Sequence, residues 1–319
     1  MLARMDFQRP PPELLPYGLR ALKMVAMANG VFDDSERHLL TTAMHLFGAD
    51  LDLDALAPIE PDELASRITD PALKKQLVRA MVIVSLIDGD ASPEEATLVE
   101  RFAAALAIDT ADLTALRHLA DKSLLRARYD IARRFFAREK VIEFTKQKGV
   151  GWLASAIAAM AGLREDSALA DRYRALGELP PGSLGRGYFD FIRGQGFSFP
   201  GEKGSPPEII SLHDLTHVLS GYGTDPHGEL SVLAFHAGCR REEKDPFGFI
   251  LFGIAEFHLG IAMSPVATGS RGALDPVAVF AALQRGLACK IDPTDGWDPW
   301  PVMHRPLVEL RAEYGISPP

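Results

Sequence analysis

Hydrophobic residues recur at helical spacing along much of this chain. Between residues 20 and 125 the pattern is that of several amphipathic helices. An Ala-rich helix is also predicted over Gly151–Leu163, where it would pack within the core or between the subunits of a homo-oligomer. In the second half, one short predicted helix has apolar residues around much of its circumference. These residues are Leu212, Leu215, Val218 and Leu219. The pattern therefore predicts an all-α fold.

The most apolar segment, Phe247–Met263, carries two ionisable residues, Glu256 and His258. It falls short of the roughly 20 residues that cross a bilayer. We interpret it as a central buried helix of the domain that the second half of the chain forms; the alternative is a helix that also lines a tunnel for an apolar ligand or touches a membrane surface. Its two ionisable side chains then need partners inside the fold.

The N-terminal helices contain an internal repeat. Ala28–Glu36 is echoed 59 positions later by Ile87–Glu95. Each copy follows an apolar helical stretch and ends it at an Asx-Gly turn, where glycine supplies the left-handed conformation. Each then starts a new helix with a capping box, in which an N-cap side chain and a glutamate three residues later exchange hydrogen bonds with the backbone. The predicted pairs are Asp33 with Glu36 and Ser92 with Glu95.

The second copy also begins like a calcium-binding loop, with Asp88, Asp90 and Ser92 at the required spacing. An EF-hand needs glycine at the sixth loop position and a bidentate glutamate at the twelfth. Pro93 and Val99 stand there instead. Helix capping is therefore the favoured role of these carboxylates, and metal binding is the alternative.

The repeat resembles the tellurite-resistance TerB-like helical domains, whose paired D-G-x-x-x-x-x-E units it matches in part. The first copy departs from that pattern, with Asn29 in place of the aspartate. The resemblance implies an all-helical interaction or sensing module, without implying tellurite chemistry.

A basic stretch, Leu124–Lys148, separates this region from the rest of the chain. We interpret it as a solvated helix face, with contact to anionic lipid headgroups as the alternative. It marks a domain boundary, from which we predict a TerB-like domain at residues 1–135 and a metal domain at 136–319. Its cations are Arg126, Arg128, Arg133, Arg134, Arg138, Lys140, Lys146 and Lys148.

Composition narrows the class of protein. The 319 residues carry a net charge of −9, which argues against a nucleic-acid partner because such proteins usually present a basic face. Two cysteines, Cys239 and Cys289, form no disulfide framework and no zinc pattern, so we expect a reducing cytoplasm. Met1–Pro16 lacks the apolar run of a signal peptide.

The most informative motif lies in the second half. On a helix, His213, Asp214 and His217 share an arc of about 100°. The segment 221–228 reads as a loop that reverses the chain, so that Glu229 opens a second, antiparallel helix and adds a carboxylate to the same place. Two imidazoles and two carboxylates suit a divalent metal. We favour Zn²⁺, with Fe²⁺, Mn²⁺, Co²⁺ or Mg²⁺ as alternatives.

The residues of this motif have alternative roles. Two histidines four residues apart are often a surface feature, but the apolar surroundings here favour burial, where ionisable groups need partners. Asp214 either binds the metal or orients a neighbouring imidazole. His236, seven residues after Glu229, is either a nearby acid/base or a core histidine.

His213-Asp214-x-x-His217-x11-Glu229 resembles the signature of the ubiquinone (coenzyme Q) biosynthesis protein four family. The Gly-rich segment Leu179–Tyr188 resembles the one that precedes the family's metal helix, and the ending from Trp300 to Arg311 resembles its C-terminal helix. Together these cover about residues 140–319, with all four metal positions matched.

The resemblance implies metal-dependent oxidative decarboxylation and hydroxylation at C1 of a prenylated hydroxybenzoate ring. His213 and Asp214 would be catalytic, and Phe247–Met263 with Pro276–Leu283 would offer walls for the prenyl tail. The implied partners are prenylated quinone precursors, other quinone-biosynthesis proteins and the inner face of the cell membrane. A non-catalytic prenyl-lipid-binding scaffold is the alternative; a metal hydrolase is weaker, because no H-E-x-x-H pattern occurs.

Overall fold

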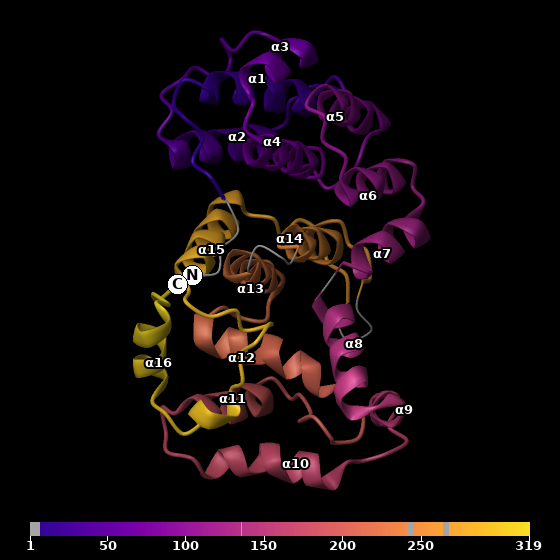
Figure 1. Cartoon of the computed structure of the whole chain (residues 1–319), viewed down its shortest axis with the longest axis vertical. Coiled ribbons are helices and arrows are strands. Elements are labelled where there is room, and N and C mark those ends of the chain that lie inside the picture. The colour runs from indigo at the N-terminus through magenta and orange to yellow at the C-terminus, as the bar shows by residue number, and fades with distance from the viewer. Residues whose placement is uncertain (1–6, 135, 241–244, 264–267) are drawn as a thin grey trace. The chain divides into compact units, whose positions relative to one another are not determined.

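The computed structural model describes residues 7–134, 136–240, 245–263 and 268–319. Within these ranges the chain forms sixteen α-helices, joined by short 3₁₀ and π turns, and no β-strand (Figure 1). The all-α prediction is confirmed. No helix in the described part of the chain is long and apolar enough to cross a lipid bilayer.

The helices divide into two compact units. Among the described residues, one unit contains 7–133 together with Leu251–Phe280, and the other contains Arg134–Ile250 and Ala281–Pro319. The first division lies close to the predicted boundary between residues 135 and 136. Leu251–Phe280 instead packs with the N-terminal unit. Hydrophobic periodicity does not reveal this, because it reports on local structure and not on which unit a segment joins.

The N-terminal unit is built on the repeat. Its first seven helices are α1 (Leu15–Ala26), α2 (Asp34–Phe47), α3 (Pro61–Arg67), α4 (Pro71–Val84), α5 (Pro93–Ala105), α6 (Ala111–Ala120) and α7 (Leu124–Ala132). The two copies end α1 and α4 and begin α2 and α5. At both turns the glycine is left-handed, with φ of 88° at Gly30 and 89° at Gly89.

Both predicted capping boxes are formed. The Asp33 side chain accepts a hydrogen bond from the Glu36 N–H at 2.8 Å, and the Glu36 carboxylate accepts one from the Asp33 N–H at 2.8 Å. Ser92 and Glu95 make the same exchange at 3.1 and 3.2 Å. Capping therefore gives these glutamates a structural role at the start of α2 and α5.

The returning segment is fixed to this unit through a buried histidine. It comprises the end of α14 (Phe247–Gly253) and a π-helix, Ile254–His258. The His258 Nε2–H donates to the Ile87 carbonyl at 2.9 Å, and its Nδ1 accepts from the Leu274 N–H at 3.1 Å. Burial lowers the pKa of His258, in keeping with this neutral tautomer. The predicted buried helix is thus present up to His258, but from Leu251 onward it belongs to the N-terminal unit and not to the predicted metal domain.

The second unit contains the helices that carry the predicted metal site. They are α8 (Phe136–Lys148), α9 (Val150–Met160), α10 (Ser167–Arg174), α11 (Leu184–Gly194), α12 (Ser211–Ser220), α13 (Pro226–Cys239) and α16 (Leu307–Tyr314), together with the part of α15 (Pro276–Ala288) that begins at Ala281. Tyr173, Tyr188, Leu215 and Phe235 lie in its core. A Cβ built on Gly238 would lie 2.3 Å from the Leu283 carbonyl oxygen, so glycine is required where α13 packs on α15.

Part of the basic stretch neutralises acidic groups of the same unit. Arg134 pairs with Asp245 at 2.6 Å, and Lys140 pairs with Glu143 at 2.6 Å. Arg126, Arg128 and Lys146 are exposed, as a solvated face predicts. The side chains of Arg138 and Lys148 lie outside the described residues.

We predict that Glu36→Gln reduces the loss of folding stability of the N-terminal unit at high pH. Burial raises the pKa of Glu36 to about 8, and its Oε1 has no hydrogen-bond partner in the described chain. The folded protein therefore keeps a proton that the unfolded chain loses, and stability falls as pH rises from about 5 to 8. A glutamine retains the capping oxygen, so the variant should be more stable than wild type at pH 8 by about 1–2 kcal/mol.

Urea unfolding of the full chain at pH 5 and pH 8 measures the effect. The exposed Glu94→Gln, on the first turn of α5, is the matched control and should follow wild type. Equal pH dependence in wild type and Glu36→Gln would contradict the assignment of a proton to Glu36.

Candidate metal centre

Helix α12 presents two histidines on one face. It begins directly after a 3₁₀ turn, Glu208–Ile210, and it ends at Gly221, which is left-handed with φ of 83° and caps the helix. His213 and His217 are one turn apart, so both imidazoles project to the same side. The side chain of His217 is 1% exposed and that of His213 is 16% exposed.

A tight reversal brings the carboxylate to them. The Asp225 side chain caps α13 by accepting hydrogen bonds from the His227 and Gly228 N–H groups at 3.1 and 3.2 Å. A Cβ built on Gly228 would lie 2.2 Å from the Gly223 carbonyl oxygen. Glycine therefore allows the loop to pass directly over the first turn of α13, which carries Glu229.

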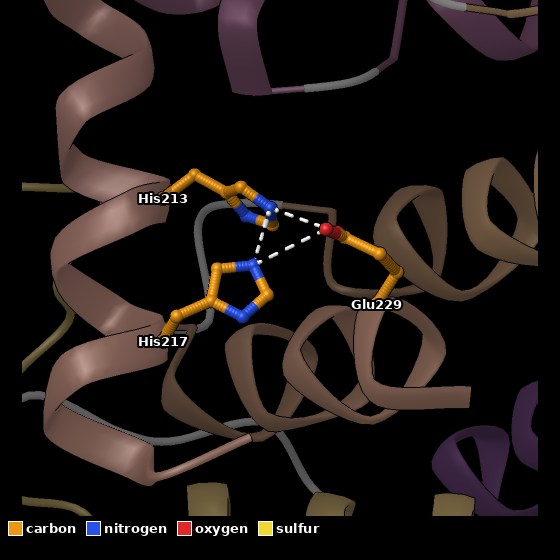
Figure 2. Close-up of side chains that lie close together, drawn as sticks. All are labelled: His213, His217 and Glu229. Atoms are coloured by element: carbon orange, nitrogen blue, oxygen red, sulfur yellow. Dashed lines mark hydrogen bonds and ion pairs between the residues drawn. The ribbon is translucent and has the colours of Figure 1, made fainter. Parts of the chain in front are cut away.

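Three of the four predicted ligands converge (Figure 2). The Nε2 of His213 lies 3.1 Å from a Glu229 carboxylate oxygen and 3.1 Å from the Nε2 of His217. The His217 Nε2 lies 3.5 Å from the second oxygen of Glu229. Ligand atoms bound at about 2.1 Å to one metal, with angles of 90–110°, are separated by about 3.0–3.4 Å. The three groups thus fit one coordination sphere.

Hydrogen bonds on the far side of each ring prepare these nitrogens to bind. The His217 Nδ1–H donates to the Tyr222 carbonyl at 3.2 Å, which leaves a lone pair on Nε2. The Nδ1 of His213 lies 3.4 Å from the Nε2 of His236. When His213 donates to His236, its own Nε2 also presents a lone pair toward Glu229.

His236 is a core histidine in contact with the candidate site. It is fully buried, and its ring stacks on the rings of His213 and Phe249. The distances between ring centroids are 5.5 Å to His213 and 5.2 Å to Phe249. Burial, and then the positive charges of His213, His217 and Arg240, hold its pKa well below the usual range. A neutral His236 can accept the His213 proton, so it positions the ligand.

Electrostatics favour a cation between these groups. Burial pushes the pKa of Glu229 upward, but hydrogen bonds from His213 and His217 outweigh it and hold the pKa at about 2. Burial also acts to lower the pKa of His213, and the bond to Glu229 outweighs it and raises that pKa. A proton shared between an imidazole and Glu229 would relieve the contact between these groups. A divalent cation would replace it at the same place.

Asp214 does not join the cluster. Its position turns its side chain about 100° around α12 from that of His213. It is half-buried, and burial raises its pKa to about 6 against the opposing charges of His213 and His217. Burial raises the pKa values of Tyr173 and Tyr188, and the charge of Asp214 adds to the effect. Its role as a ligand stays a prediction.

Three neighbours of the site were not foreseen from the sequence. The Tyr222 carbonyl holds His217, the ring of Phe191 stacks on His217 at 5.5 Å, and Ser211 at the start of α12 lies 3.1 Å from the Tyr173 hydroxyl. A backbone carbonyl leaves no mark in the amino-acid sequence. The aromatic contacts depend on how α10 and α11 pack against α12.

Comparison with models of known protein families gives no match, and comparison with curated proteins gives none either. The resemblance carried by the motif in α12 and α13 therefore stays a prediction.

We predict that His217→Ala lowers bound metal to well below one ion per chain. The substitution removes one of three converging ligands, and His213 and Glu229 alone are too few to hold the ion tightly. Elemental analysis of the purified protein measures this. His227→Ala, an exposed histidine on the same turn as Glu229, is the control and should keep full metal content. Full occupancy in His217→Ala would refute the assignment.

His236→Phe should weaken metal binding without emptying the site. A phenyl ring can retain the stacking on Phe249 but cannot accept the proton of His213. Loss of such an orienting hydrogen bond costs about 10–100-fold in metal affinity. Competition with a chromophoric chelator measures the dissociation constant. An unchanged constant would show that His236 is only a packing residue.

Proposed function

We propose that this chain takes part in ubiquinone (coenzyme Q) biosynthesis as a metal-dependent enzyme. The reaction would replace the C1 carboxylate of a prenylated hydroxybenzoate by a hydroxyl. The observation that carries the proposal is the convergence of His213, His217 and Glu229 on one point, since these are the residues on which the family resemblance rests. Three protein ligands leave coordination positions for a substrate, as catalytic sites require.

The donor set fits two kinds of metal. Two imidazoles and one carboxylate hold Zn²⁺ in hydrolytic enzymes and Fe²⁺ in non-haem oxygenases. When bound, the metal would supply Lewis acidity toward the ring carboxylate, and a redox-active ion would also supply electron transfer. Because Zn²⁺ has no redox chemistry, an oxidative step favours Fe²⁺ or Mn²⁺ as the working ion.

The overall reaction balances with dioxygen as the oxidant. The bond from C1 to the carboxyl carbon breaks and a C1–oxygen bond forms, while the carboxyl group leaves as CO₂. One oxygen atom enters the ring as hydroxyl. The other is reduced to water by two electrons from a reductant and two protons.

The chain's own groups have distinct tasks in this scheme. His213, His217 and Glu229 would hold the cation, His236 would orient the His213 ring, and Asp214 would accept or donate a proton. The Asp214 carboxyl has a pKa of about 6, so it exchanges protons near neutral pH. It lies beside the cluster without belonging to it, which suits a group that faces substrate.

A prenyl-lipid-binding scaffold is the competing function. In that case the cation would brace α12 against α13, and prenylated intermediates would be held for other enzymes and delivered near a membrane surface. Within Pro276–Leu283, one of the two segments expected to form walls for the tail, Ala281 is exposed and Ala282 is buried. The tail-binding walls therefore stay a proposal.

We expect the iron-loaded full chain to release labelled CO₂ from a prenylated hydroxybenzoate carrying ¹³C in its carboxyl group. Asp214→Asn should bind metal as wild type does and release CO₂ at least about 100-fold more slowly, because it cannot exchange a proton. Glu208→Gln, a control near the start of α12, should retain the rate.

The same assay separates the competing functions. Tight binding of the prenylated ring without CO₂ release, with any of the candidate metals and a reductant present, would favour the scaffold. If the chain neither binds the prenylated ring nor releases CO₂, both functions are contradicted.

A further inference from the structure

The N-terminal unit contains a cavity of about 550 Å³ that the metal chemistry does not use. It lies between α1, α5 and the segment that leads into α3. Met24, Met27 and Leu98 provide much of its apolar surface, and Leu56 and Pro58 form the opposite wall. Its size is that of a small-molecule site, which typically encloses about 300–1,000 Å³.

Side chains of α1 fix that wall in place. Arg20 donates to the carbonyls of Ala57 and Pro58. Lys23 donates to the carbonyls of Asp54 and Leu56 at 3.0 and 3.2 Å. The Ile59 N–H donates to the Met24 sulfur at 3.0 Å. The cavity is therefore formed before any ligand arrives, which lowers the ordering cost of binding.

Positive charge gathers at the cavity on a protein whose net charge is −9. Hydrogen bonds to carbonyls hold the Lys23 ammonium, and Asp54, a carboxylate on which its charge acts, pairs with Arg37 at 2.9 Å. Arg101 is exposed and makes no side-chain hydrogen bond or ion pair within the described residues. Arg20 is paired with Glu63 at 3.0 Å, and Glu94 is the acidic residue in the lining. The cationic groups outnumber the acids.

The apolar surface beside these cations is unusually accessible. Met27 is 48% exposed, and methionine adapts its shape to irregular apolar ligands. An apolar floor with a cationic edge matches a molecule that has a flexible hydrocarbon chain and an anionic end. A protein partner is disfavoured, because a stable protein interface spans about 20–30 residues on each side.

We propose that this cavity binds an amphiphilic anion, with its hydrocarbon chain along Met24, Met27 and Leu98 and its anionic group against Lys23 and Arg101. The site belongs to the N-terminal unit and does not depend on the proposed metal chemistry. It gives the TerB-like region a ligand of defined chemical class.

Decanoate, used below its micelle concentration, is the test ligand. Titration of the full chain by calorimetry should give saturable binding of one decanoate per chain, and decyltrimethylammonium, with the same chain and the opposite charge, should bind at least about tenfold more weakly. Arg101→Glu should weaken decanoate binding by about tenfold or more. Arg126→Glu, an exposed arginine on α7, is the matched control and should bind as wild type.

A second variant tests the location. Leu98→Trp places a larger ring in the cavity, so it should block decanoate while leaving the thermal unfolding midpoint within a few degrees of wild type. The proposal is overturned if wild type shows no saturable binding, if the cationic amphiphile binds equally well, or if neither Arg101→Glu nor Leu98→Trp changes the affinity. Metal content stays at the wild-type level in every arm, so failure here leaves the metal assignment intact.

Discussion

The passage of Gly223 over Gly228 is the constraint on which the candidate metal centre depends. Because Gly228 carries no Cβ, the loop after α12 can lie against the first turn of α13. That contact brings Glu229 back to the two histidines within a few residues of the helix end. Any side chain at Gly228 would meet the Gly223 carbonyl and move the carboxylate away from His213 and His217.

The converging groups are held by the protein on their far sides. The His217 Nδ1–H donates to the Tyr222 carbonyl of the same reversal, and the His213 ring contacts His236 in the last turn of α13. The reversal thus supplies both a ligand and an orienting acceptor. This arrangement keeps two lone pairs and one carboxylate facing each other, which is unfavourable unless a proton or a cation lies between them.

Local features of the fold were predictable because they depend on neighbours along the chain. The capping boxes of Asp33 and Ser92, and the common face of His213 and His217, follow from spacings of three and four residues. The approach of Glu229 to the two histidines was also predictable, because the glycine-rich loop before it indicates a chain reversal. Tertiary packing decided the rest: Leu251–Phe280 joins the N-terminal unit, and the ligand cluster among the described residues contains His213, His217 and Glu229 without Asp214.

The two units carry independent kinds of site. The second unit gathers a compact set of metal-binding groups, whereas the first presents a cavity with an apolar floor and cationic edge. Both arise from short helices locked by capping and by backbone contacts.

The chemistry of the whole protein depends first on whether a metal occupies the cluster. Anomalous X-ray diffraction from crystals soaked with Zn²⁺ or Fe²⁺ tests that claim most directly. We predict one strong peak per chain, about 2.0–2.2 Å from His213 Nε2, His217 Nε2 and a Glu229 oxygen. A peak bound elsewhere, or no peak at the cluster in metal-loaded crystals, would contradict it.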